Sequence, residues 1–200
     1  MRLAPSINKV ATASNVARLI ALLFLSSAFG VFGEDASKPV SYTRGPDLDP
    51  VHGRIISITD GDTVKALTAA NEQIRVRLAF IDAPEKGQAF GQRAKQAMSE
   101  LVFGKDVKLL PQTIDRYGRL IAQVFVEGQD AGLEMLKQGL CWVYEKYISE
   151  ASAEIQTSYR AAQSAAQSDR LGLWQDPDPV PPWQWRKSEK EHTRMVQEVS

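Results

Sequence analysis

Hydrophobic and polar residues follow one another along the middle of the chain in the short alternating runs that are typical of β-strands. Residues 51–59 and 63–67 form two such runs on either side of Asp60-Gly61-Asp62, and Asp-Gly between apolar runs is a strong signal for a β-hairpin. Residues 74–81 alternate apolar with basic positions and then become wholly apolar, which predicts a strand that passes from a barrel wall into a buried core. Further strands are predicted at 107–110 and 120–126.

Helices are predicted where apolar residues recur at steps of three and four positions. The first covers about 90–101 and is ended by Gly104, the second covers about 131–138 and is closed by Gly139, and the third covers about 150–168. The order of strands and helices is that of a five-stranded Greek-key barrel with appended helices. We therefore predict an α+β domain with an OB-fold and about three α-helices.

Prolines interrupt the chain after Gly172, at positions 177, 179, 181 and 182. Proline removes a backbone donor and clashes with the preceding helical turn, so this segment is predicted not to be helical. Trp174, Trp183 and Trp185 indicate that the segment packs on the domain, because large aromatic rings favour burial. Residues 187–200 are rich in charged residues and are predicted to form a frayed C-terminal tail.

The first 33 residues differ from the rest of the chain. They contain three basic residues and no acidic one, and an uncharged run covers 19–33. This run is short for a bilayer, which needs about 20 residues, but it suits the apolar part of an export signal. We predict that residues 1–33 are a signal peptide and that the protein is periplasmic or secreted; an uncleaved membrane anchor and a buried helix are the alternatives. Residues 34–50 are rich in proline and are predicted to be a linker.

Composition limits the chemistry that such a domain can perform. The chain has 24 Lys and Arg against 24 Asp and Glu, so it is not one of the strongly basic proteins that coat nucleic acid. Its one cysteine, Cys141, excludes a cysteine-based zinc cluster and is predicted to be a core residue, and its two histidines disfavour a poly-histidine metal site. A metal would therefore be held by oxygen ligands, which favour Ca²⁺ or Mg²⁺.

Three short clusters place carboxylates and arginines near strand ends or turns, where functional side chains are often found. The clusters are Asp60-Gly61-Asp62-Thr63 and the segments 77–85 and 115–119. Each cluster on its own has a structural explanation, as a turn, a solvated strand face or a strand end. Together they supply carboxylates at 62, 82 and 85 and guanidinium groups at 77 and 119, a combination that suits a divalent ion and a phosphate.

In their order and spacing these clusters resemble those of the staphylococcal nuclease family, the thermonuclease or micrococcal nuclease-like domains. The family shows Asp-Gly-Asp-Thr, then Arg-x-x-x-x-Asp-x-Pro-Glu, then Asp-x-Tyr-Gly-Arg, and all three stand unbroken within residues 51–186, the predicted nuclease domain. The ending at 172–186 resembles the exported bacterial branch. The resemblance implies an OB-fold endonuclease that depends on Ca²⁺ and hydrolyses DNA and RNA to products with 3′-phosphate ends.

The resemblance also implies a role for each matching position. Some positions match metal ligands, others match groups that act on the phosphate or on water, and a third set consists of candidates for substrate contacts. The metal ligands would be Asp62, Asp82 and the carbonyl of Ala83. The groups acting on the phosphate or on water would be Arg77, Glu85 and Arg119. The candidates for substrate contacts are Arg116, Tyr117 and an aromatic wall that Tyr144 or Tyr147 could form.

A phosphodiester resists attack because its negative charge repels nucleophiles, so a hydrolytic site must neutralise charge and hold a water molecule in line. A hard divalent ion and two guanidinium groups would neutralise the charge, and Glu85 would activate the water or only position it. We predict an endonuclease of low sequence specificity, a monomer without an obligate protein partner, that acts most readily on single-stranded or fraying DNA and RNA. The alternatives are a non-catalytic OB module that binds nucleic acid or a protein, and a membrane-tethered nuclease.

Overall fold

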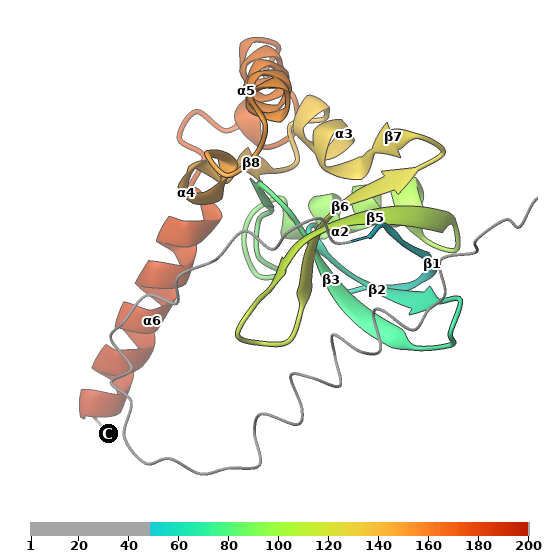
Figure 1. Ribbon diagram of the computed structural model, residues 1–200. Coiled ribbons are helices and arrows are strands. Elements are labelled where there is room, and N and C mark those ends of the chain that lie inside the picture. The colour runs from blue at the N-terminus through green and yellow to red at the C-terminus, as the bar shows by residue number, and fades with distance from the viewer. Residues whose placement is uncertain (1–48, 200) are drawn as a thin grey trace, which may run out of the picture. The chain divides into compact units, whose positions relative to one another are not determined.

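Five strands close into a barrel in the computed structural model, which describes residues 49–199 (Figure 1). The pairing is antiparallel in the order β3, β2, β1, β5, β6, and a parallel pairing of β3 with β6 closes the ring. The predicted α+β domain with a five-stranded, OB-like barrel is confirmed. The strands are β1 (Val51–Ile58), β2 (Thr63–Thr68), β3 (Gln73–Leu78), β5 (Asp106–Ile114) and β6 (Leu120–Val126).

The alternating pattern of the sequence becomes the two faces of the barrel wall. In β3, Ile74, Val76 and Leu78 are buried, whereas Arg75 is exposed and Arg77 is largely but not fully covered. Successive side chains of a strand point to opposite faces, so the apolar residues enter the core and the arginines lie on the outer face. The outer face of β3 therefore carries two arginines that are two residues apart.

The strand predicted over 74–81 is wrong at its end, because the chain leaves the barrel where β3 stops. Phe80 has a left-handed backbone conformation, with a φ of 66°, which a continuous strand does not allow. The chain then forms a separate short strand, β4 (Ile81–Asp82), which pairs with β8 (Trp142–Val143). This break moves Asp82 off the barrel wall and buries it completely.

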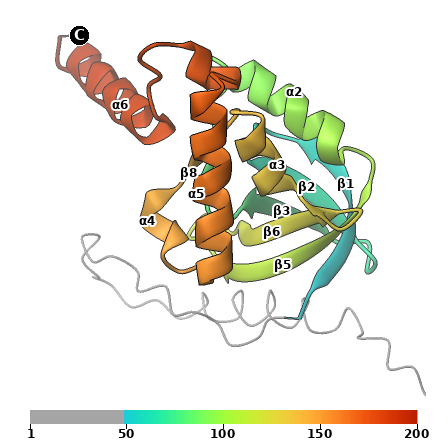
Figure 2. The same ribbon diagram turned by 90° about the horizontal axis from the view of Figure 1, so that it is seen from above.

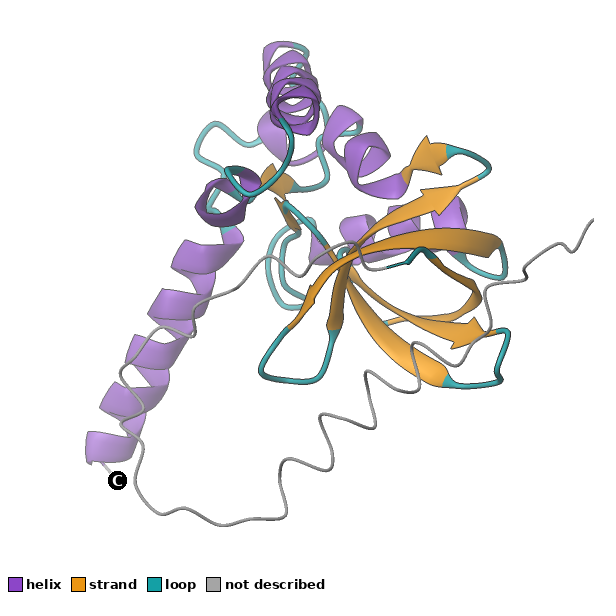
Figure 3. Ribbon diagram, in the orientation of Figure 1, coloured by secondary structure: helices purple, strands orange, loops and turns teal. Residues whose placement is uncertain are grey.

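The three predicted helices are present as α2 (Gly91–Val102), α3 (Ala131–Lys137) and α5 (Ala153–Ser168). Helices α3 and α5 lie above the barrel in Figure 3 and toward the viewer in Figure 2, so they cover one side of it. The structure also contains elements too short for their periodicity to be recognised in the sequence. These are β7 (Gln129–Asp130), α4 (Glu145–Ile148) and the 3₁₀ helix η2 (Gly172–Gln175).

Asp130 joins α3 and α5 to the barrel. Its Oδ1 atom accepts hydrogen bonds from the backbone N–H groups of Gly132 and Leu133 and so caps the first turn of α3. Its Oδ2 atom accepts from the Tyr159 hydroxyl of α5 at 2.7 Å and from the Gln123 amide of β6 at 3.0 Å. One carboxylate thus satisfies donors from three elements and sets the position of the helical layer relative to the barrel.

The chain is helical again from Pro182 onward, so the prediction of a non-helical, frayed end is wrong. Helix α6 covers Pro182–Val199 and extends away from the barrel (Figure 1). Proline is favoured at the start of a helix because the first N–H groups have no helical acceptor. The carbonyl of Pro181 also accepts hydrogen bonds from the N–H groups of Gln184 and Trp185. The two prolines therefore set where this helix begins.

Tryptophan rings anchor the segment before α6 and its first turn, as the sequence predicts. Trp174 meets Trp142 edge to face, with 4.3 Å between the ring centroids, and Trp183 meets the same Trp142 ring at 5.7 Å. Ala166 and Leu173 belong to the same buried cluster. The start of α6 is therefore held against β8, close to the break that follows β3.

The predicted signal peptide (1–33) and all but the last two residues of the predicted linker (34–50) lie outside the described residues. Among residues 49–199, no helix has both the length and the apolar character needed to cross a membrane.

Candidate active site

Two buried carboxylates and one arginine form the centre of the site. Asp62 lies in the turn between β1 and β2, and Asp82 ends β4, so separate segments bring them together. The guanidinium group of Arg77 spans both: its Nη1 atom lies 2.6 Å from Asp62 Oδ2, and its Nη2 atom lies 2.8 Å from Asp82 Oδ1. Asp62 is 6% exposed and Asp82 is 0% exposed, so the arginine compensates two charges that are removed from water.

The turn between β1 and β2 holds Asp62 in place. The Thr63 hydroxyl donates to Asp62 Oδ1 at 3.0 Å, and the Ala83 N–H donates to Asp62 Oδ2 at 2.9 Å. Glycine is required at position 61, because a Cβ atom on Gly61 would lie 2.7 Å from the Ala94 Cβ and 2.8 Å from the Ala83 Cβ. The Asp-Gly-Asp-Thr cluster is therefore a hairpin turn that also fixes a carboxylate.

Burial and neighbouring charges shift the ionisation of these groups. Burial opposes the charged form of Asp62, but Arg77 and the Ala83 N–H outweigh it and hold the pKa of Asp62 below its ordinary value. Burial, together with the charge of Asp62, raises the pKa of Asp60 to about 7. Although burial opposes it, the pKa of Arg77 is raised, because Asp62 and Asp82 favour its charged form. Asp62 and Arg77 are thus a fully charged pair at neutral pH.

Arg186 of α6 supplies a further cation, which sequence reasoning missed. Its Nη1 atom lies 2.7 Å from Glu85 Oε1 and 3.1 Å from Asp82 Oδ1, and its Nη2 atom lies 2.7 Å from Asp82 Oδ2. Burial raises the pKa of Asp82 even though this pairing favours its charged form. Arg186 and Asp82 are 104 residues apart in the chain, and the only signal for Arg186 was its place at the end of the segment 172–186.

Glu85 lies at the rim of the centre. Its side chain is 37% exposed, so water and a ligand from solvent can reach it. The loop that carries Glu85 is fixed by Gln88, whose side chain accepts a hydrogen bond from the Glu85 N–H at 3.2 Å and donates one to the Val180 carbonyl. The segment that leads into α6 thus supports the loop as well as delivering Arg186.

Arg119 lies beside the centre without touching its carboxylates. Its Nε and Nη2 atoms are each 2.7 Å from Asp115 Oδ2, and in the part of the chain that the structure describes no ion pair joins it to another carboxylate. The parallel pairing sets Arg77 opposite Ile121. Arg119, two residues before Ile121, is therefore level with Arg75 at the entry to β6. The sequence predicted that both arginines meet the carboxylates at one site. Arg77 does so, whereas Arg119 lies only near that site.

Arg116 and Tyr117 occupy the tip of the turn between β5 and β6. Tyr117 is 57% exposed, and the guanidinium groups of Arg116 and Arg119 lie 4.9 and 5.6 Å from the centroid of its ring. Arg75 of β3 donates a hydrogen bond to the Tyr117 carbonyl, which docks the turn on the outer face of the barrel. The turn therefore presents an exposed aromatic ring between positive charges.

Tyr144 connects the centre to an aromatic surface. The guanidinium group of Arg77 lies 5.9 Å from the centroid of the Tyr144 ring. The ring of Trp183 is almost parallel to it, at an angle of 2° and a centroid separation of 6.1 Å, and Tyr147 meets Tyr144 edge to face at 4.8 Å. Burial and the charge of Asp82 raise the pKa of the Tyr144 hydroxyl. Tyr144, one of the two tyrosines considered for the aromatic wall, is therefore in contact with the centre through Arg77.

Cys141 lies close to these residues in the sequence but takes no part in the site. It is completely buried, and burial raises the pKa of its thiol well above its ordinary value. Such a thiol is a small core residue, as predicted, because only a thiolate is a good nucleophile.

The donor set suits a hard divalent cation. One guanidinium group reaches Asp62 and Asp82 together, so a single ion can reach both. Among residues 49–199, no three side chains of Asp, Glu, His or Cys form a complete metal-binding group. An ion would therefore also take carbonyl, water or phosphate oxygens, which Ca²⁺ and Mg²⁺ accept. The N–H of Ala83 is bonded to Asp62, and the role of its carbonyl stays a prediction.

The sequence of this chain is similar to those of known proteins. A family model described as staphylococcal nuclease homologue matches residues 75–176. An uncharacterized endonuclease of Haemophilus influenzae is 47% identical over 137 residues, which are 68% of this chain and 74% of that protein. The micrococcal nuclease of Shigella flexneri is 35% identical over 178 residues, which are 84% of this chain and 99% of that protein. An uncharacterized endonuclease of Escherichia coli O157:H7 is 39% identical over 137 residues, 68% of this chain and 85% of that protein.

Proposed function

Because the chain belongs to the staphylococcal nuclease family and is a nuclease that hydrolyses phosphodiester bonds, we propose that it is a Ca²⁺-dependent endonuclease of low sequence specificity, which cleaves DNA and RNA and leaves 3′-phosphate ends. The observation that carries the proposal is the single centre in which Arg77 spans Asp62 and Asp82, with Glu85 at its rim. Such a centre combines fixed positive charge with an accessible carboxylate, the two requirements for attack of water on a phosphodiester.

Asp62 and Asp82 would hold the ion, and the carbonyl of Ala83 is the third proposed protein ligand. Asp62 suits this role because its pKa is held below its ordinary value, so that the carboxylate is charged at neutral pH. The Thr63 hydroxyl and the Ala83 N–H fix its orientation. When bound there, Ca²⁺ would neutralise part of the phosphate charge and polarise one of its oxygens.

Arg77 and Arg119 would contact the scissile phosphate. A planar guanidinium group forms two parallel hydrogen bonds with phosphate oxygens, and both arginines are already oriented by carboxylates, so little rotational freedom is lost on binding. Arginine keeps its proton under all ordinary conditions. Both residues would therefore stabilise the charge of the transition state rather than donate a proton to the leaving oxygen.

Glu85 would remove a proton from the attacking water. Its side chain is partly exposed to solvent, whereas those of Asp62 and Asp82 are buried. Pro84 precedes it and limits the conformations of the loop. Arg186 holds one of its oxygens at 2.7 Å and leaves the other without a hydrogen bond among residues 49–199. That second oxygen is the one that would meet the water.

Bases of the substrate would stack on the aromatic side of the centre. Tyr144 and Trp183 offer ring faces next to Arg77, and Arg116 and Tyr117 offer charge and a ring on the other turn. Stacking on protein rings needs unpaired bases and tolerates any sequence, which supports a preference for single-stranded or fraying DNA and RNA. We also propose that the enzyme is a monomer and that a signal at residues 1–33 directs its export.

Removal of Ca²⁺ tests the metal assignment. We expect the purified chain to cut plasmid and single-stranded DNA in the presence of Ca²⁺ and to lose nearly all activity in excess chelator, because without the ion the two buried carboxylates repel the phosphate and no metal polarises it. Gel assays measure the rates, and end-group analysis of the products should show 3′-phosphates. Equal rates with chelator would contradict the Ca²⁺ assignment. A chain that binds DNA under both conditions without cutting it would support the non-catalytic binding module instead.

Arg186 should compete with the ion. Because Arg186 pairs with both oxygens of Asp82, an ion that binds Asp82 must displace part of this pairing. We expect Arg186→Gln to bind Ca²⁺ about tenfold more tightly, a change of about 1.4 kcal/mol, as measured by titration calorimetry. Lys187→Gln is the matched control, because it removes the same charge from a side chain that is 79% exposed and should leave the affinity unchanged. Equal or weaker binding by Arg186→Gln would show that no such competition exists.

A further inference from the structure

Two basic side chains face each other on the outer face of β2 and β3. The strand register sets Lys65 directly opposite Arg75, and the next pair on the same face is Thr63 with Arg77. Residues opposite each other in an antiparallel pair have Cβ atoms about 5 Å apart. Among residues 49–199, neither side chain forms a salt bridge, and the hydrogen bond that Arg75 donates goes to the uncharged Tyr117 carbonyl.

A third cation extends this pair onto the neighbouring strand. Arg119 is level with Arg75 and precedes Ile121, which lies opposite Arg77 on the same outer face. Lys65 on β2, Arg75 on β3 and Arg119 at the entry to β6 therefore form a row, here called the basic row. The row lies about 7 Å from Arg77 along β3, the length of two strand residues. Asp115 compensates Arg119, so Lys65 and Arg75 are the members without a carboxylate partner among residues 49–199.

The barrel does not need the two charges for its stability. Like charges directly opposite each other destabilise a sheet. The same strands are held together on their inner face by Val64, Ala66 and Val76, all of which are completely buried. The repulsion between Lys65 and Arg75 is therefore a cost of the folded state that an anion on the outer face would relieve.

We propose that Lys65 and Arg75 of the basic row bind the backbone phosphate next to the scissile one, which makes them substrate-binding residues of the enzyme, while Arg119 at the end of the row keeps its proposed contact with the scissile phosphate. The inference rests on the proposed function, because it takes Arg77 as the ligand of the scissile phosphate. Phosphate contacts set the position of a strand without reading its sequence, which suits an enzyme of low specificity. The row and the Tyr144 and Trp183 rings would thus hold different parts of one substrate strand, its backbone and its bases.

Binding of a short fluorescein-labelled single-stranded DNA tests the basic row. The parent is the full chain with Glu85→Gln, which keeps the DNA uncut, in Ca²⁺. Adding Lys65→Gln and Arg75→Gln should weaken binding about fivefold at low salt. It should also reduce the slope of log affinity against log salt by about 0.7, the value for one phosphate contact on a single strand. A smaller salt dependence of the affinity would therefore show that a contact with phosphate is lost.

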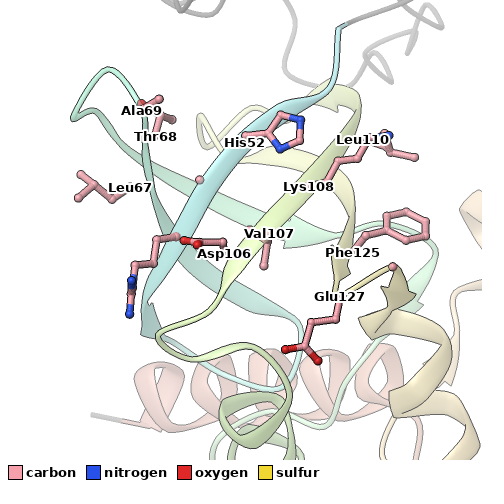
Figure 4. A pocket seen from close by; sticks show the side chains of 13 residues that line it. His52, Leu67, Thr68, Ala69, Asp106, Val107, Lys108, Leu110, Phe125 and Glu127 are labelled. Atoms are coloured by element: carbon pink, nitrogen blue, oxygen red, sulfur yellow. The ribbon is translucent and has the colours of Figure 1, made fainter.

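A matched control removes one lysine and one arginine elsewhere. Lys108 and Arg170 are exposed, on β5 and after α5. Lys108 lines a cavity of about 770 Å³ on the outer face of β1 and β5, together with His52 and Phe125 (Figure 4). Lys108→Gln with Arg170→Gln changes the net charge by the same amount, so it measures the effect of charge alone. We expect it to preserve the slope of the parent.

The outcomes separate the basic row from the proposed function. We expect the thermal midpoint of the Lys65→Gln, Arg75→Gln variant to stay close to that of the parent, because relief of the repulsion offsets the loss of the hydrogen bond that Arg75 donates to the Tyr117 carbonyl. The inference would be overturned by an unchanged salt slope or by an equal loss of DNA affinity in the control pair. A lower thermal midpoint would also overturn it, because it would show that the row is structural. If the parent itself fails to bind DNA, the proposed function is contradicted as well. If the parent binds DNA and the two substitutions have no effect, only the role of the basic row is contradicted.

Discussion

Replacement of Arg77 by lysine should lower the rate of DNA hydrolysis by about 10²–10³-fold, the usual loss when a preorganised charge-stabilising donor is removed. The guanidinium group reaches Asp62 and Asp82 at once, with contacts of 2.6 and 2.8 Å from two different nitrogens. The single ammonium nitrogen of lysine cannot reproduce both contacts or form a bidentate pair with phosphate. The charge is preserved, so the loss would come from geometry. Initial rates on single-stranded DNA at saturating Ca²⁺ measure it.

Arg54→Lys is the matched control for this variant. Arg54 is an exposed arginine of β1, and its replacement should leave both the rate and the stability unchanged. Circular dichroism and the thermal midpoint of Arg77→Lys show whether the chain still folds around the two buried aspartates. A folded Arg77→Lys enzyme that keeps a rate within a few-fold of the unchanged chain would remove Arg77 from the catalytic centre.

Glu85→Gln should lower the rate by about 10²–10⁴-fold, the contribution of a general base. Glutamine has nearly the same shape and can still accept the hydrogen bond from Arg186, so the loop should keep its place. It has no basic oxygen with which to take a proton from water. Single-turnover rates with excess enzyme separate the chemical step from binding and product release.

Glu127→Gln provides the comparison, because Glu127 is an exposed glutamate in the turn after β6 and lines the outer cavity rather than the centre (Figure 4). Its rate should match that of the unchanged chain. If Glu85→Gln binds DNA normally and cuts it at the full rate, Glu85 only positions water or Arg186. A full rate with weaker Ca²⁺ binding would instead assign Glu85 to the ion.

Much of the barrel could be predicted from local patterns. The apolar and basic alternation of β3 indicates a strand with one buried face, and the structure places Val76 inside and Arg75 outside accordingly. The Asp-Gly turn and the three amphipathic helices have signals of the same kind, because the exposure of each side chain repeats with the period of its own element. The end of β3 could not be predicted, because the positive φ of Phe80 has no periodic signal.

The candidate site was predicted in part. The resemblance of the motif clusters to those of the nuclease family implied that Asp62, Asp82 and Arg77 belong to one site, and the structure brings them into contact. Arg119 is level with Arg75 rather than with Arg77, because its position along the barrel depends on the register of β6 against β3. A register of this kind is set by the packing of the whole barrel rather than by the residues of the turn.

Arg186 and helix α6 show why local patterns are not sufficient. Proline is unfavourable inside a helix and favourable at its start. Whether a helix begins at a proline depends on whether a carbonyl, such as that of Pro181, accepts the hydrogen bonds of the first free N–H groups. The pairing of Arg186 with Asp82 joins residues 104 positions apart. It is formed because the edge-to-face packing of Trp183 on Trp142 seats the first turn of α6 on β8.

The sequence alone therefore specified the barrel strands and the amphipathic helices, because the burial of neighbouring residues in each repeats with a short period. It also specified the carboxylate and arginine clusters, because each consists of residues that are close together in the chain. The folded molecule specified which of those charges share one centre, added Arg186 to them, and set Lys65 against Arg75. Contacts of this second kind depend on the path of the whole chain, because the free energy that seats one element on another is summed over many distant side chains.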